Sequence, residues 1–133
     1  MNPHYPEVSH RAAHRCEYCR APEVIFNFPF EVEHVIPIYH EGADEPPNLA
    51  LSCRSCNIHK ASYLTGFDEV AQEDTVLFNP RLDSWQDHFR VDKETGAILA
   101  ATSIGRATAS RLNMNRETQL AARLQWMRLG LFP

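Results

Sequence analysis

Four cysteines are the residues of this chain whose spacing points most directly to chemistry. Cys16 and Cys19 form one Cys-x-x-Cys pair, and Cys53 and Cys56 form a second pair after 33 intervening residues. Each pair presents two thiolates at the spacing that a tetrahedral ion requires, so two matched pairs predict a closed, structural zinc site. A thioredoxin-like redox centre needs one such pair rather than two, and buried free thiols are the remaining alternative.

Side chains suited to hydrolysis lie between and beside these pairs. Glu33 and His34 stand together early in the segment, Asn48 lies midway, and Asn57 and His59 follow the last cysteine. An imidazole titrates near neutral pH, so His34 is a candidate general base. If one zinc ion joins the two cysteine pairs, it also brings Glu33 and His34 close to Asn57.

The segment from residue 16 to residue 60 resembles the HNH endonuclease motif in three stretches: Glu33-His34-Val-Ile-Pro, Asn48-Leu49 and Cys53-x-x-Cys56-Asn57-x-x-Lys60. The resemblance implies a ββα-metal unit, in which a hairpin packs on one helix with a divalent ion between them. It also implies hydrolysis of DNA phosphodiester bonds, with 5′-phosphate and 3′-hydroxyl products. A looser likeness to small stand-alone bacterial HNH proteins continues through residues 77–85, 104–108 and 114–115.

The resemblance implies a role for each matched residue. His34 matches the general base that activates water, and Asn48 matches the asparagine that holds the loop and orients the base. Glu33 and Asn57 match the positions that bind the catalytic ion, for which Mg²⁺ or Mn²⁺ suits oxygen ligands. His59 lies about 200° around an ideal helix from Asn57, so the two do not easily face one ion and either is a candidate ligand.

The charge distribution indicates which parts of the chain can contact a polyanionic partner such as DNA. The net charge is −4, but residues 1–80 carry five basic and twelve acidic side chains, whereas residues 81–133 carry eight and five. We therefore expect DNA to meet Arg54, Lys60 and the C-terminal part, because phosphate contacts need cations. Five arginines there are either a DNA-facing patch or a solvated helix face: Arg106, Arg111, Arg116, Arg123 and Arg128.

The pattern predicts one α+β domain over residues 1–133, with a zinc-stapled core at 15–66 and a C-terminal hairpin with two helices at 76–133. Residues 24–26 and 28–35 are rich in β-branched and aromatic side chains and predict a first hairpin. Asn48 is expected to cap a short turn over residues 49–51. The other expected elements are helices at 6–15, 53–63, 103–112 and 115–129, and a hairpin of strands 85–92 and 97–102.

Two hypotheses compete with an endonuclease. The family more often has aspartate where Glu33 stands, which motivates a second hypothesis: the ion site is weak, and the chain is a zinc-stabilised module that binds nucleic acid without cleaving it. The net charge of −4 instead motivates a zinc-ribbon adaptor that binds protein. The apolar runs fall far short of the roughly 20 residues of a membrane span, and the N-terminus does not look like a signal peptide, so we expect a cytoplasmic protein. We expect neither a membrane partner nor a small organic cofactor, and the sequence does not determine the oligomeric state.

Overall fold

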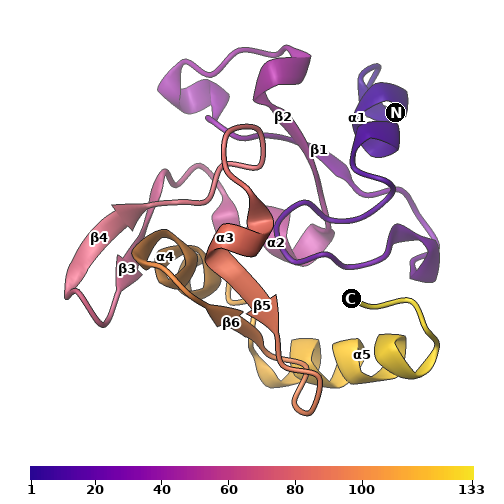
Figure 1. Ribbon diagram of the computed structural model, residues 1–133. Coiled ribbons are helices and arrows are strands. Elements are labelled where there is room, and N and C mark those ends of the chain that lie inside the picture. The colour runs from indigo at the N-terminus through magenta and orange to yellow at the C-terminus, as the bar shows by residue number, and fades with distance from the viewer.

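The computed structural model describes residues 1–133 and shows a mixed α+β fold built from short elements (Figure 1). The five α-helices are α1 (Tyr5–Arg11), α2 (Arg54–Lys60), α3 (Trp85–His88), α4 (Ser103–Arg111) and α5 (Glu117–Arg128). The six strands are β1 (Glu31–His34), β2 (Leu49–Ser52), β3 (Thr65–Asp68), β4 (Glu73–Val76), β5 (Phe89–Val91) and β6 (Ile98–Ala100). The strands pair as three separate antiparallel ribbons, and the predicted fold class is confirmed.

The first hairpin pairs β1 with β2, and α2 follows β2 directly. All four residues of β2 are buried, because its Leu-Ala-Leu-Ser run packs on both faces. In β1, by contrast, Glu33 is the one buried residue. This hairpin and α2 form a ββα arrangement, whose two strands are joined by a connection of residues 35–48.

The predicted pairing of residues 24–26 with 28–35 is wrong. Residues Glu23–Ile25 form a 3₁₀ turn instead, and Val24 is largely exposed. The Glu23 carboxylate accepts hydrogen bonds from the Phe30 backbone N–H and the Tyr5 hydroxyl, and it lies 2.7 Å from His14 Nδ1. These bonds fold the segment back on α1, so β1 finds its partner at β2.

Three further local expectations need correction. Asn48 ends a 3₁₀ turn (Pro46–Asn48) and is followed by β2, because residues 49–51 are drawn into the buried strand rather than a capped turn. Residues 64–78 contain the unpredicted β3–β4 ribbon, which projects from the body of the molecule (Figure 1). The expected strand 85–92 begins as the helical turn α3 and becomes extended only at Phe89.

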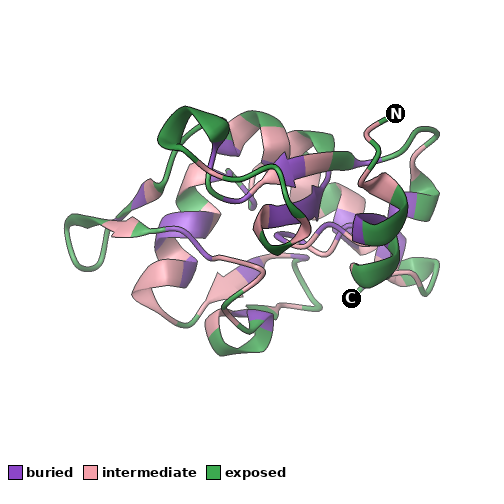
Figure 2. Cartoon of the chain, turned by 90° about the horizontal axis from the view of Figure 1, so that it is seen from above, coloured by how far each residue is buried: buried purple, intermediate pink, exposed green.

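Of the 35 buried residues, 21 hydrophobic ones form one contiguous cluster that extends from Val8 to Phe132. Figure 2 marks the buried positions in purple. The cysteines belong to it, together with aromatic residues of the C-terminal part. Trp85 Nε1 donates to the Tyr18 carbonyl at 2.8 Å, and Phe78 packs edge-on against the Tyr18 ring. The C-terminal elements therefore pack directly against the cysteine-bearing segment.

None of the helices has the length and apolar character that spanning a membrane requires.

Candidate functional site

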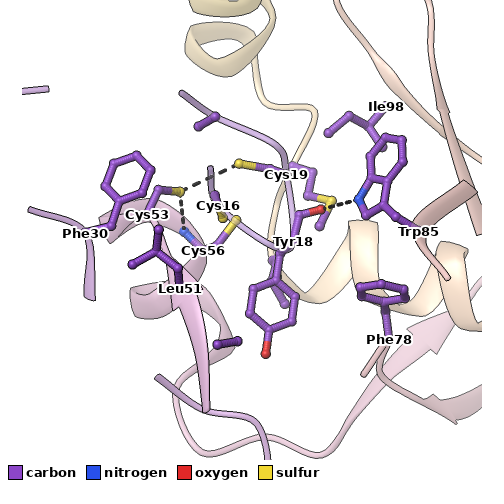
Figure 3. Packing of buried hydrophobic residues seen from close by; sticks show 14 of the residues in the cluster. Cys16, Tyr18, Cys19, Phe30, Leu51, Cys53, Cys56, Phe78, Trp85 and Ile98 are labelled. Carbon is purple, nitrogen blue, oxygen red and sulfur yellow. Dashed lines mark hydrogen bonds between the residues drawn. The ribbon is translucent and has the colours of Figure 1, made fainter. Parts of the chain in front are cut away.

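The four cysteine sulfur atoms converge at the centre of the N-terminal part (Figure 3). All four lie within 4.8 Å of one another, and the Cys19 and Cys53 sulfurs are 3.7 Å apart. A tetrahedral ion with Zn–S bonds of about 2.3 Å holds its sulfurs about 3.8 Å apart, so the cluster fits a structural metal such as zinc. Cys53 also caps α2, because its sulfur accepts from the Cys56 backbone N–H.

Hydrogen bonds within the cluster shift the pKa values of its thiols in opposite directions. Burial disfavours the Cys16 thiolate, but hydrogen bonds from the other three thiols outweigh burial and hold the pKa of Cys16 well below its usual value. Hydrogen bonds to Cys16 and Cys19 raise the pKa of Cys56 well above its usual value, because a second buried negative charge is unfavourable beside the first. A bound divalent ion would remove this penalty by neutralising the thiolates.

Glu33 is occupied by a buried structural contact. Its carboxylate accepts from the Tyr18 hydroxyl at 2.6 Å and forms an ion pair with Lys60 Nζ at 3.2 Å. Burial raises the pKa of Glu33, and the Lys60 charge offsets part of that rise. Burial and the neighbouring carboxylate also raise the pKa of Tyr18, so its hydroxyl stays protonated and donates.

The same contact occupies Lys60, which is only 2% exposed. Besides Glu33, its ammonium donates to the Val35 carbonyl at 2.9 Å and the His34 carbonyl at 3.3 Å. The ammonium therefore ties α2 to the end of β1 and is not placed to meet the phosphate that the sequence led us to expect there. Arg54, by contrast, is exposed and its side chain makes no hydrogen bond or ion pair.

His34 faces the opposite side of β1 from Glu33, because successive strand residues alternate between faces. Its Nε2 lies 2.9 Å from Asp44 Oδ1, and its side chain is about one-quarter exposed. A carboxylate only accepts hydrogen bonds, so this contact places the proton of a neutral imidazole on Nε2. Nδ1 is then left as the basic nitrogen.

Asn48 holds the loop that carries Asp44. Its amide group donates to the Ile36 carbonyl at 2.9 Å and the Ala43 carbonyl at 2.8 Å, and its oxygen accepts from the Ile36 N–H. The loop passes so close to itself that a Cβ on Gly42 would lie 1.7 Å from the Ile36 carbonyl oxygen. Only glycine fits there, and the resulting tight loop places Asp44 beside His34.

Asn57 borders the same hollow as His34, between β1, the start of the loop and the end of α2. Its side chain makes no hydrogen bond within the protein, so its amide oxygen is free to bind a ligand. Glu33 also borders the hollow, but its carboxylate oxygens are already bonded to Tyr18 and Lys60. The structure thus brings His34 and Asn57 together, while the Glu33 carboxylate is engaged elsewhere.

His59 lies on another side of α2. Its Nδ1 is 2.7 Å from the Ser55 carbonyl, and its Nε2 is 3.3 Å from Arg116 Nη1 at the start of α5. Both ring nitrogens are therefore in use. His59 also borders a different hollow from the one that His34 and Asn57 share.

The comparisons with known proteins agree with this geometry. Residues 16–62 match the model of the HNH endonuclease family. This segment is an HNH endonuclease domain. A search of curated proteins and a search of solved structures found no significant match. An HNH domain implies a nuclease-type function and a nucleic-acid substrate, and here it coincides with the ββα arrangement and the four-cysteine cluster.

Sequence reasoning missed two residues that shape the HNH domain. Asp44 lies ten residues after His34 in a loop rich in proline and acidic residues, where no periodic spacing marks it. Tyr18 sits between two cysteines, and only its contact with Glu33 shows its role.

Proposed function

We propose that this protein is a metal-dependent endonuclease that hydrolyses DNA phosphodiester bonds at the hollow shared by His34 and Asn57. The observation that supports this proposal most strongly is the His34–Asp44 pair, in which a carboxylate orients an imidazole at the mouth of a hollow beside an unpartnered amide. The HNH family match gives the reaction class.

His34 acts as the general base. Asp44 holds its Nε2–H and stabilises the imidazolium that forms when Nδ1 takes a proton from water. The water oxygen attacks phosphorus and the bond from phosphorus to the 3′ oxygen breaks. The leaving 3′ oxygen takes a proton from solvent water, so the cut strand ends in a 5′-phosphate and a 3′-hydroxyl. Asn48 acts indirectly, because it holds the loop that presents Asp44.

A divalent ion, Mg²⁺ or Mn²⁺, would bind the free amide oxygen of Asn57 and otherwise water and substrate phosphate, as Mg²⁺ does in sites with few protein ligands. It would supply charge stabilisation at the phosphate and the leaving oxygen. Glu33 and His59 are not included in this ligand set, because the Glu33 carboxylate and both His59 nitrogens have partners inside the protein.

One observation favours a second candidate function. With Glu33 engaged by Lys60, the lining of the hollow offers the ion no free carboxylate, and Asp44, outside the lining, already contacts His34. Such a site would bind an ion weakly, and the HNH domain would then act as a zinc-stabilised module that binds nucleic acid with little or no cleavage.

Plasmid nicking in Mg²⁺ or Mn²⁺ separates the two functions. We expect wild type to nick and His34→Ala to lose about 10²- to 10⁴-fold in rate, the usual contribution of a general base. Asp44→Asn should lose about tenfold or more, because it removes the acceptor that fixes the imidazole, while the neighbouring Glu45→Gln should cut like wild type. Equal rates for His34→Ala and wild type would refute His34 as base, and binding without nicking in any divalent ion would favour the second candidate.

A further inference from the structure

A second hollow also borders α2 and lies between the loop of residues 26–28, α2 and the start of α5. Its volume is about 440 Å³, within the range of about 300 to 1,000 Å³ that is typical of ligand sites. Arg54 and Arg116 contribute cationic groups to its lining, and Phe28 contributes an aromatic ring. None of its eight lining residues carries a carboxylate, in a protein whose net charge is −4.

Arg116 is held in place with donors to spare. The Ser55 carbonyl can only accept, so His59 Nδ1 carries the ring proton and His59 Nε2 accepts from Arg116 Nη1. Arg116 Nε donates to the Thr118 hydroxyl at 3.2 Å. Its Nη2 has no acceptor in the protein and is available to an anionic oxygen.

Most other arginines of the C-terminal part are already paired. Arg123 is fully buried and donates to the Gly96 carbonyl, and Arg106 forms an ion pair with Asp68. Arg111 donates to a backbone carbonyl and stacks on a tyrosine ring. Of the five arginines in the candidate patch, the unpaired ones are therefore Arg116, which joins Arg54 at the hollow, and Arg128 at the far end of α5.

Phe28 gives the hollow an exposed aromatic surface. Its side chain is 47% exposed and packs on no other ring, whereas Phe26 packs edge-on against Phe30 and Trp126. Exposed aromatic rings beside cationic side chains are the usual platform for single-stranded nucleic acid, because each base has a face that stacks.

The two hollows are linked along the exposed side of α2. On an ideal helix Arg54 lies about 60° around the axis from Asn57, and Ile58 about 100°. Arg54 is exposed and Ile58 is 58% exposed. A strand whose phosphate occupies the hollow at His34 can therefore continue across this side of α2 without meeting an acidic side chain of the helix.

We propose that the hollow between α2 and the start of α5 is a subsite for the nucleic-acid strand next to the cleaved bond, where Arg54 and Arg116 hold a backbone phosphate and Phe28 stacks on a base. This assignment rests on the proposed function, because it takes the strand to be cut at His34. His59 is a positioning residue, since it orients Arg116.

Binding of a fluorescein-labelled single-stranded oligodeoxynucleotide to the zinc-loaded chain of residues 1–133 tests the subsite without catalysis. In fluorescence anisotropy without added Mg²⁺, Arg116→Gln and Arg54→Gln should each weaken binding about three- to tenfold and reduce the slope of log K against log salt by about 1. Phe28→Ala should weaken binding without changing the slope. Arg128→Gln is the matched control, because Arg128 is exposed about 18 Å further along the same helix.

The outcomes separate this inference from the proposed function. Wild-type binding that Arg116→Gln and Arg54→Gln leave unchanged, or absence of binding by wild type, would overturn the subsite. If these variants lose binding but wild type nicks no DNA, the hollow stands as a nucleic-acid-binding site and the proposed cleavage at His34 fails. If wild type nicks DNA and the variants match Arg128→Gln, the subsite alone fails. A loss of binding in Arg54→Gln cannot be attributed to misfolding, because the Arg54 side chain makes no hydrogen bond or ion pair in the fold.

Discussion

At the scale of single residues, Glu33 and His34 are adjacent but belong to different parts of the molecule. The Glu33 side chain enters the core, where it meets Tyr18 and Lys60, and His34 opens to the hollow with Asn57. A buried ion pair is costly to break, because the remaining charge keeps its desolvation penalty. Glu33 therefore supports the fold of the HNH domain, and the chemistry that we propose rests on His34.

Glu33→Gln tests this division of roles. We expect the free energy of unfolding to fall by about 3 kcal/mol, because the substitution leaves the Lys60 charge buried without its counter-ion. Urea denaturation measures the loss, and Glu31→Gln, an exposed position on the same strand, should cost little. A fully stable Glu33→Gln protein that loses affinity for Mn²⁺ would instead show that Glu33 is an ion ligand.

At the scale of elements, the four-cysteine cluster joins the turn at residues 16–19 to the start of α2. Both pairs are buried, and no disulfide links them. The hairpin and α2 are short, so their relative placement depends on this junction. An ion that binds four thiolates contributes its binding free energy to folding.

Metal content and the stability of cysteine variants test the junction between residues 16–19 and α2. We expect one zinc per chain, and Cys19→Ser should lose the metal together with the near-ultraviolet circular dichroism of the packed core. Ser55→Ala, a substitution on α2 outside the cluster, should keep both. A Cys19→Ser protein that lacks metal yet unfolds at the wild-type temperature would contradict a structural role for the cluster.

The β3–β4 ribbon is tied to α4 by Asp68, which gives a test by pH. Hydrogen bonds from Arg106 and then Ser103 hold the pKa of Asp68 well below its usual value of about 3.9. The stabilisation is therefore fully present above that value and is lost as the pH falls through the lower pKa of the folded state. In urea denaturation at a series of acidic pH values, the free energy of unfolding of Asp68→Asn should depend less on pH than that of wild type. Asp74→Asn, an exposed position on β4, should show the wild-type dependence.

At the scale of the whole molecule, we propose that the HNH domain and the C-terminal part form one cooperative unit. The buried cluster is continuous from Val8 to Phe132. Trp85 donates to the Tyr18 carbonyl between the cysteines, and Arg15 donates to the Leu131 carbonyl near the C-terminus. Such contacts leave neither part with a complete core of its own.

Two probes can test this cooperativity in one denaturant titration. Both tryptophans lie in the C-terminal part, whereas the four cysteines lie in the N-terminal part. Tryptophan fluorescence and zinc release to a chromogenic chelator should therefore change at the same denaturant concentration. Trp85→Phe should lower both midpoints together, because it removes the hydrogen bond to Tyr18. Separate midpoints would show two independent units.

The sequence alone determined the parts of this protein that depend on residue type and local spacing. The two Cys-x-x-Cys pairs indicated the metal cluster, because few side chains bind a metal ion. The order of His34, Asn48 and Asn57 resembled the motif of the HNH family. The helices α4 and α5 also followed from local signals such as the Thr102 cap, whose hydroxyl accepts from the Gly105 N–H.

Only the tertiary structure decided which partners these residues have. It paired β1 with β2 rather than with residues 24–26, because Glu23 folds that segment back on α1. It also pairs Glu33 with Lys60 and Asp44 with His34. Such pairings join residues that are 10 to 27 positions apart, so the local sequence around one residue does not identify its partner. They follow from burial and from the need to satisfy each buried charge, which only the complete fold defines.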